Sequence, residues 1–399
     1  MFAWELGGGL GHVTKGLLLG ERLVAAGCEV SFAVRDLAAT HPLLPDTHYR
    51  LFQAPVSWVR LQGAPEPASY AELLLKTGFG HAAALHGLVR GWLTLFEADK
   101  TDLVIADHAP SALLAARCAG LPAVVFGHGF FMPSSDWPVF RTWEPVPAAR
   151  TSQANAQVLA GMNACLAAFG AAPLAQLADL FDTATSYLCT APPLDHYLDR
   201  QQPRATHVGT LWVDSVGEPA RWPGQEADTR RRVFAYLRPD LPGFDQVLTA
   251  LSNCGASVLI VSPGIAAETA ARWQSERLVL TPRLVRLDDV ARAADLVMCS
   301  GSDTLHGMAL CGVPVLGLPM NAEQRIAAER VTATGAGRWL LPGSSADGIN
   351  AALRDLLSNP QYRQAAQALQ QQHARPSVDA QLAPVVAACL QLTRPAGAG

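Results

Sequence analysis

The residues best suited to chemistry stand near the start of the chain, in a glycine-rich turn that ends in a histidine. Phe2–Leu6 is a short apolar run, Gly7–His12 follows it directly, and the residues up to Ala26 have the apolar spacing of a helix. A strand, such a turn and a helix in this order place backbone N–H groups at the open edge of a parallel sheet. Histidine is well suited to exchange a proton near neutral pH. We therefore expect His12 to lie at a binding crevice rather than in a core.

A second turn, rich in small and hydroxylated residues, lies in the other half of the chain. Ser300–Thr304 follows the expected strand Asp295–Cys299 and precedes the helical pattern of Leu305–Leu310. Hydroxyl groups at a helix N-terminus add donors to the backbone N–H groups and to the helix dipole, and such a site typically binds a diphosphate. An ordinary helix start is the alternative, with Ser302 or Asp303 as the capping residue.

The segment after this turn favours a binding site. Residues 319–324 again run from a strand through a loop into a helix, and they carry Glu323 and Gln324. An acid and an amide at this position are suited to hold the hydroxyl groups of a sugar. Two such turns, one in each half of the chain, imply two ligands.

Composition excludes several classes of function. The 399 residues are half hydrophobic, which allows two buried cores, and the formal net charge is −4. No basic stripe is present, so nucleic acid is not an expected partner. The eight cysteines are scattered without C-x-x-C spacing, which favours a reducing compartment over a zinc site or disulfides. We expect no signal peptide and no transmembrane segment, and hence a cytoplasmic protein.

Strand-like and helix-like segments alternate along the chain, which predicts α/β architecture with parallel sheets. We expect a Rossmann-like domain over residues 1–212, a polar linker over 213–229, a second Rossmann-like domain over 230–359, and C-terminal helices over 360–399 that pack back on the first domain. Two such domains would place their ligand-binding edges across a shared cleft. The expected strands are Phe2–Leu6, Glu29–Val34, Leu103–Ala106, Ala123–Phe126, Val233–Leu237, Ser257–Val261, Leu278–Thr281, Asp295–Cys299 and Val313–Leu318.

The arrangement resembles the GT-B glycosyltransferases of the family 1 kind, which include macrolide, glycopeptide-antibiotic and plant secondary-metabolite enzymes. Gly7–His12 is similar to that family's G-x-x-G-H turn, and Val104–Asp107 to the strand whose terminal acid supports the catalytic histidine. Leu284–Val331 resembles the donor signature, with G-V-P at Gly312–Pro314 and the acid–Gln pair at Glu323-Gln324. The resemblance covers nearly the whole chain. It implies a GT-B fold and the transfer of a sugar from a nucleoside-diphosphate sugar.

By this resemblance His12 is a general base that deprotonates an acceptor hydroxyl, while Asp107 orients its ring. Two simpler interpretations stay open from the residues alone. His12 could be a histidine at the start of a helix that only makes a hydrogen bond to a loop. Asp107 could cap the expected helix Ser111–Ala119.

The acceptor site is expected in the first domain, between the walls Pro55–Phe79 and Gly129–Arg150. These loops do not identify the acceptor, which could be a small molecule, a lipid or a protein. The aromatic residues of Trp137–Trp143 are explained equally well by packing of the loop. The expected acceptor-binding residues are Gly9, Gly11, His128 and Phe130.

Two departures from the family pattern concern the donor. The family usually has a phosphate-binding histidine near Cys299 and often a ribose-binding glutamate at Gly307. The glycopeptide-antibiotic branch also lacks that glutamate and has a histidine where His306 stands. A dTDP-sugar, with its deoxyribose, is therefore an option beside a UDP-sugar. Arg238 either replaces the missing phosphate ligand or is a plain surface residue. The expected donor-binding residues are Arg238, Ser300, Gly301, Ser302, Asp303, Thr304, His306, Glu323 and Gln324.

The chain contains no D-x-D triplet, so the usual carboxylate pair for a nucleotide-bound metal is missing. We expect an inverting transferase without metal or cofactor, in which amides, hydroxyls and a helix dipole receive the leaving charge. Three alternatives stay open. A nicotinamide oxidoreductase could use Asp36 for ribose, but G-x-G-x-x-G would need glycine where His12 stands. A nucleotide-sugar 2-epimerase shares the architecture but needs its own acid/base set, which is not evident. A degenerate sugar-nucleotide-binding protein would bind without turnover.

Overall fold

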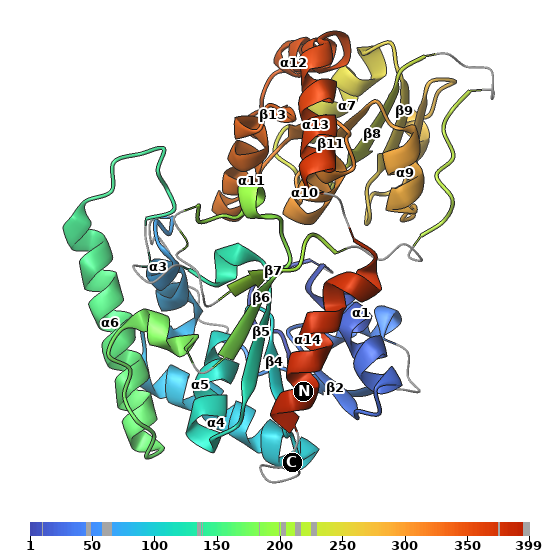
Figure 1. The fold of residues 1–399 in the computed structure, drawn as a ribbon. Coiled ribbons are helices and arrows are strands. Elements are labelled where there is room, and N and C mark those ends of the chain that lie inside the picture. Colours follow the sequence, from blue (N-terminus) through green and yellow to red (C-terminus); the bar gives the residue numbers. More distant parts are fainter. Residues whose placement is uncertain are drawn as a thin grey trace. The chain divides into compact units, whose positions relative to one another are not determined.

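In the computed structural model, the chain forms two parallel β-sheets, each flanked by helices (Figure 1). The structure describes residues 1–399 except 10, 45–48, 58–65, 134–136, 138, 183, 199, 201–204, 212–216, 225–229, 374–375 and 394–399. The chain divides into two units, which are described separately. Unit 1 comprises Met1–Thr190, Tyr197–Gly209 and Pro376–Gly399, and unit 2 comprises Ala191–His196 and Thr210–Arg375.

The sheet of unit 1 has the order β3-β2-β1-β4-β5-β6-β7 in the part of the chain that the structure describes, and all neighbouring strands are parallel. The chain therefore runs outward from β1 to β3, returns to the middle at β4, and continues to the other edge. Its strands are β1 (Phe2–Ala3), β2 (Val30–Val34), β3 (Tyr49–Gln53), β4 (Val104–Ala106), β5 (Ala123–Gly127), β6 (Ala184–Leu188) and β7 (Ala205–His207).

The helices of unit 1 begin and end where the sequence has the appropriate residues. The helix α5 begins at Pro110, whose missing N–H costs nothing at a first helical position, and ends at Ala119, where Gly120 caps it with a left-handed φ of 66°. The unit contains α1 (Gly11–Ala25), α2 (Leu37–Thr40), α3 (Tyr70–Leu74), α4 (Ala82–Asp99), α5 (Pro110–Ala119), α6 (Ala148–Ala168) and α14 (Val378–Thr393), with the short turns η1 (His41–Leu43), η2 (Leu75–Phe79), η3 (Gly129–Phe131) and η4 (Leu177–Leu180).

The sheet of unit 2 has the order β10-β9-β8-β11-β12-β13 among the described residues, again with all neighbours parallel. Its strands are β8 (Arg232–Tyr236), β9 (Ser257–Val261), β10 (Leu278–Thr281), β11 (Leu296–Cys299), β12 (Val315–Gly317) and β13 (Gly337–Trp339). Its helices are α7 (Phe244–Asn253), α8 (Ala267–Trp273), α9 (Leu287–Ala293), α10 (Ser302–Leu310), α11 (Ala322–Ala333), α12 (Ala346–Ser358) and α13 (Pro360–Gln372), with the turn η5 (Pro192–Leu194).

Each strand presents alternate residues to opposite faces of its sheet, and in unit 2 each face has its own apolar core. Val233 and Ala235 of β8 lie in the core shared with α7 and α12, whereas Phe234 lies in the core shared with α10 and α11. Strands buried on both faces are continuous apolar runs, which is why they were visible in the sequence.

Both sheets have a point where the strand order reverses, between β1 and β4 in unit 1 and between β8 and β11 in unit 2. Ala3 pairs with Ala106, and Tyr236 pairs with Cys299, so the carboxyl ends of each pair are level. Open α/β sheets bind their ligands beyond the carboxyl ends of the strands at this switch point. The two turns that the sequence singled out follow β1 and β11.

The C-terminal segment requires a correction to the expected domain limits. We expected residues 360–399 to pack on the first domain, but α13 belongs to unit 2, and only α14 belongs to unit 1. Ala366 and Leu369 of α13 are buried in the core that contains α10, whereas Asp379 of α14 accepts a hydrogen bond from Arg22 of α1 at 2.8 Å. In Figure 1, α14, in red, lies beside α1, in blue.

Two further points concern the remaining domain expectations. Residues 213–216 and 225–229 of the expected linker lie outside the described residues, as does the tail 394–399. Among the helices that the structure describes, none is both long enough and apolar enough to cross a membrane.

Candidate active site

The carboxyl ends of β1 and β4 bring His12 and Asp107 together in unit 1. His12 is the second residue of α1, and Asp107 follows β4 directly. Nδ1 of His12 lies 3.0 Å from Oδ2 of Asp107, and both side chains are buried. This is a close contact rather than an aligned hydrogen bond.

Asp107 has no other polar partner in the described part of the chain. Its side chain is fully buried, and neither carboxylate oxygen makes a hydrogen bond to a described residue. A buried carboxylate is costly unless a cation or a strong donor compensates its charge, and an imidazole that takes up a proton does so. The capping alternative for Asp107 is wrong, because the N-cap of α5 is Ala109.

Two glycines, which lack a side chain, leave space for the side chains of His12 and Asp107. Gly7 has a φ of 84°, and a Cβ there would lie 2.9 Å from Nε2 of His12. A Cβ at Gly127, the last residue of β5, would overlap Oδ1 of Asp107. Gly9, predicted to bind the acceptor, has open space where a Cβ would be, and Gly11 begins α1. Residue 10 of this turn lies outside the described residues.

Aromatic rings enclose the imidazole of His12. The indole of Trp4 stacks on it with a centroid distance of 5.1 Å, and the ring of Phe131 lies 5.3 Å away. The sequence predicted Phe130 for the acceptor site, but Phe130 is buried and packs against Phe140 at 5.1 Å. The η3 turn therefore presents Phe131, rather than Phe130, to His12. The predicted acceptor residue His128 immediately precedes this turn and is also buried.

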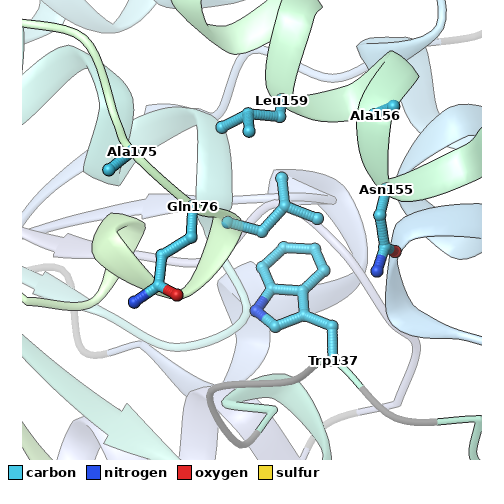
Figure 2. Close-up of a pocket in the computed structure, with 7 residues that line it drawn as sticks. Trp137, Asn155, Ala156, Leu159, Ala175 and Gln176 are labelled. Carbon is cyan, nitrogen blue, oxygen red and sulfur yellow. The ribbon is translucent and has the colours of Figure 1, made fainter. Parts of the chain in front are cut away.

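A hollow of about 190 Å³ lies farther along unit 1, over the indole ring of Trp137 (Figure 2). Trp137 is almost fully buried and packs edge-on against Tyr70 at 5.1 Å, so it is a core residue of the expected acceptor wall. Residues 58–65, 134–136 and 138 of the two expected walls lie outside the described residues. The lining residues are Trp137, Asn155, Ala156, Leu159, Ala175, Gln176 and Leu177.

A buried carboxyl group that the sequence analysis passed over joins the loops after β1 and β4. Glu5 accepts hydrogen bonds from the backbone N–H of Ser111 at 2.7 Å and from the indole N–H of Trp92 at 2.8 Å, and also from the Ser111 hydroxyl. It thereby caps α5, whose own N-cap residue provides no acceptor. Burial raises the pKa of Glu5 to about 7 although these donors favour the ionised form. The sequence feature that could have indicated this buried acid is the position of Glu5 inside the apolar run Phe2–Leu6.

The raised pKa of Glu5 predicts a pH-dependent stability. The pKa of Glu5 is near 4.5 in the unfolded chain and near 7 in the folded protein. Between these two pH values the carboxyl group is protonated in the folded state and ionised in the unfolded state. This proton binding stabilises the folded state. The stabilisation is complete below about pH 4.5 and is lost as the pH rises through about 7. Relative to Glu5→Gln, the wild type should therefore gain up to about 3 kcal/mol of unfolding free energy between about pH 8 and about pH 5. Urea unfolding of both proteins measures this, and Glu97→Gln, at an exposed position of α4, is the control. A difference independent of pH would contradict it.

In unit 2, hydroxyl groups gather at the N-terminus of α10, just after β11. Ser300, Ser302 and Thr304 are buried, and the Oγ atoms of both serines lack a hydrogen-bond partner among the described residues. The helix begins at Ser302, its N-cap is Gly301, and no side chain caps it. The alternative of an ordinary cap by Ser302 or Asp303 is therefore wrong. Unpaired hydroxyls beside the free N–H groups of a helix are suited to bind an anion.

The remaining predicted donor residues occupy different environments. Arg238 is exposed, and its guanidinium donates to both carboxylate oxygens of Asp240 at 2.8 and 2.7 Å, which raises the pKa of Arg238. His306 is buried, with Nε2 3.4 Å from the carbonyl oxygen of Ala327 in α11. Asp303 is partly exposed on the first turn of α10. Burial raises the pKa of the Cys299 thiol, which keeps it protonated.

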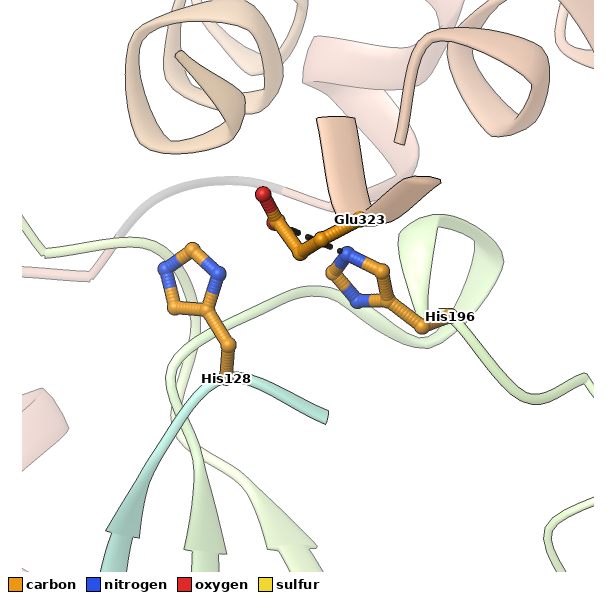
Figure 3. Close-up of side chains that lie close together, drawn as sticks. All are labelled: His128, His196 and Glu323. Carbon is orange, nitrogen blue, oxygen red and sulfur yellow. Dashed lines mark hydrogen bonds and ion pairs between the residues drawn. The ribbon is translucent and has the colours of Figure 1, made fainter. Parts of the chain in front are cut away.

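Glu323 and Gln324 stand in the first turn of α11, which follows β12. Asn321 caps this helix by accepting from the N–H of Gln324 at 3.0 Å, and Oε1 of Gln324 accepts from the N–H of Met320 at 2.8 Å. Figure 3 shows that Oε1 of Glu323 meets Nε2 of His196, at 3.1 Å, within unit 2. The sequence analysis missed His196, because nothing local to it indicates a partner 127 positions away.

Comparisons with known proteins found similar sequences and similar structures. The family described as erythromycin biosynthesis protein CIII-like, C-terminal domain, matches residues 265–389. A PGL/p-HBAD biosynthesis glycosyltransferase of Mycobacterium tuberculosis is 24% identical over 396 residues, which cover 90% of this chain and 85% of that protein.

Solved structures resemble the chain over almost its whole length. The glycosyltransferase VinC in complex with dTDP has a TM-score of 0.67 and 18% identity, with coverage of 98% of this chain and 99% of that one. Spinosyn rhamnosyltransferase SpnG complexed with spinosyn aglycone also has a TM-score of 0.67, with 20% identity and coverage of 97% and 99%. At these identities the likeness shows the fold.

Proposed function

We propose that this chain, a glycosyltransferase with the GT-B fold, moves a sugar from a nucleoside-diphosphate sugar to an acceptor hydroxyl with inversion and without a metal ion. The observation that carries the proposal is the buried 3.0 Å contact between His12 and Asp107 at the switch point of unit 1. Unit 1 would bind the acceptor, and unit 2 would bind the donor.

In this mechanism His12 is the general base. Its Nδ1 faces Asp107 and therefore carries the ring hydrogen, which leaves the lone pair of Nε2 to take the acceptor's proton. The acceptor oxygen forms a bond to the anomeric carbon while the bond from that carbon to the diphosphate breaks, and the electron pair leaves with the nucleoside diphosphate. Attack from the side opposite the leaving group inverts the anomeric centre. The carboxylate of Asp107 stabilises the imidazolium that forms.

The leaving diphosphate would be received by the N-terminus of α10. Ser300 and Ser302 offer hydroxyl donors that have no other partner among the described residues, beside the helix N–H groups. Fixed donors and the helix dipole stabilise the developing negative charge without a cation. The lack of any D-x-D triplet in the sequence supports metal independence. Glu323 and Gln324 would hold the sugar.

Product analysis tests this proposal. The full chain is incubated with α-linked dTDP-glucose or UDP-glucose and a panel of hydroxylated aglycones, with and without EDTA, and the product linkage is determined by NMR. We expect a β-glucoside and a rate that EDTA does not change. A retained α-linkage would exclude the single displacement, and inhibition by EDTA that Mg²⁺ reverses would exclude metal independence.

The donor nucleotide gives a separate prediction. Gly307 stands in α10 where a glutamate often binds the ribose, and His306 is directed to the carbonyl of Ala327. A site that hydrogen-bonds a hydroxyl can reject its deoxy analogue by about 10⁴-fold, whereas a site without that partner cannot. We therefore expect dTDP to bind at least as tightly as UDP in isothermal titration. The ligand dUDP separates the effect of the 2′-hydroxyl from that of the thymine methyl. UDP binding more than about a hundredfold tighter than dUDP would contradict the argument.

A further inference from the structure

His196 belongs to a short stretch of chain that packs in unit 2 although unit 1 precedes and follows it. Residues Ala191–His196, which we call the 191–196 segment, lie between Thr190 and Tyr197 of unit 1. Leu194 is fully buried and shares a core with Leu305 of α10 and Val331 of α11. This burial anchors the segment on the two helices that carry the proposed donor site.

The segment also makes polar contacts with two residues of α11, Glu323 and Arg330. Nε2 of His196 lies 3.1 Å from Oε1 of Glu323, and its backbone oxygen accepts from Arg330 at 3.1 Å. Glu323 and Arg330 are seven positions apart, so they lie on the same face of the helix two turns from each other. The imidazole is fully buried and its centroid is 6.0 Å from that of His306 on α10, whereas Glu323 remains 17% exposed.

The contact with His196 restricts the side chain of Glu323. A partly exposed glutamate loses side-chain entropy when it is ordered around a ligand, and a pre-existing hydrogen bond lowers that cost. One carboxylate oxygen is engaged by His196, and a carboxylate has enough lone pairs to accept further hydrogen bonds. We propose that His196 is a positioning residue of the donor site, which holds the carboxylate of Glu323 in the orientation that accepts a sugar hydroxyl. This inference rests on the proposed function, in which Glu323 binds the sugar.

The role predicts a selective effect on the sugar part of the donor. Isothermal titration of dTDP and of dTDP-glucose, without acceptor, is performed on the full chain and on His196→Ala and His196→Gln. We expect His196→Ala to weaken dTDP-glucose binding about tenfold, the scale of one hydrogen bond to a charged group, and to leave dTDP binding unchanged. His196→Gln retains a donor and should restore part of the loss, which also covers the case in which the alanine variant folds poorly.

A control and a double-mutant cycle separate this role from simple destabilisation. His373→Ala, at the end of α13 in the same unit, should leave both affinities unchanged. If His196 acts through Glu323, then His196→Ala adds no further loss in the Glu323→Ala background, in which the hydrogen-bond acceptor is gone. Equal losses for dTDP and dTDP-glucose, or losses that multiply in the double variant, would overturn the inference. If Glu323→Ala itself leaves dTDP-glucose binding intact, the proposed sugar site is wrong, which is a different outcome from failure of His196 alone.

Discussion

Replacing His12 with alanine is expected to lower kcat by about 10²–10⁴-fold, the usual contribution of a general base. The affinity for dTDP should not change, because His12 belongs to unit 1 and the proposed nucleotide site lies in unit 2. Steady-state kinetics at saturating donor and acceptor measure the first effect, and isothermal titration with dTDP measures the second. The cavity left beneath Trp4 requires that folding be checked by circular dichroism and thermal unfolding.

His81→Ala provides the matched control for this variant. His81 is exposed at the start of α4 in the same unit, so its loss should not affect turnover. A His12→Ala enzyme with kcat within about threefold of the wild type would remove His12 from the mechanism.

The second large effect is expected for Asp107→Asn. An asparagine amide can present its N–H₂ group to Nδ1 of His12, which would move the ring hydrogen onto Nε2 and block the base. The buried imidazolium would also lose the carboxylate that lies 3.0 Å from it. We expect a loss of about 10²-fold or more in single-turnover rate with little change in volume or fold.

Asp102→Asn is the control for the carboxylate. Asp102 is exposed and lies two residues before β4, at the end of the strand opposite to Asp107, so it is close to the strand but not part of the site. Single-turnover rates that fall equally in both variants would assign the effect of Asp107→Asn to the strand rather than to the dyad.

The sequence predicted strands well where a continuous apolar run is buried on both faces of the sheet. The limits expected for Ser257–Val261 and Leu278–Thr281 are confirmed, because apolar residues end where the strands end. The strand expected over Phe2–Leu6 is shorter, since β1 ends at Ala3 and Glu5 turns into the core to cap α5. The edge strand β3 was not predicted, because Tyr49–Gln53 is partly exposed and its residues alternate without a continuous apolar run.

The sequence predicted proximity where a motif follows a strand, and it did not predict contacts that join distant segments. His12 and Asp107 were identified because each follows a central strand, and parallel strands bring their carboxyl ends to one edge. His196 could not be identified in this way, since its partner Glu323 is on another helix far along the chain. That Phe131 rather than Phe130 lies beside His12 could not be predicted, because the orientation of a ring in a single turn such as η3 depends on backbone angles that residue types do not specify.

The path of the chain between the two units limits how such enzymes can be recombined. Residues before 191 and from 197 to 209 build unit 1, but the 191–196 segment packs in unit 2, and α14 returns to unit 1. A single crossover near residue 210 would therefore combine Leu194 of one parent with the unit 2 core of the other. It would also pair Arg22 of the first parent with Asp379 of the second. Chimeras that exchange unit 2 between two parents should therefore carry the 191–196 segment together with residues 210–375, and keep α14 with the parent of α1.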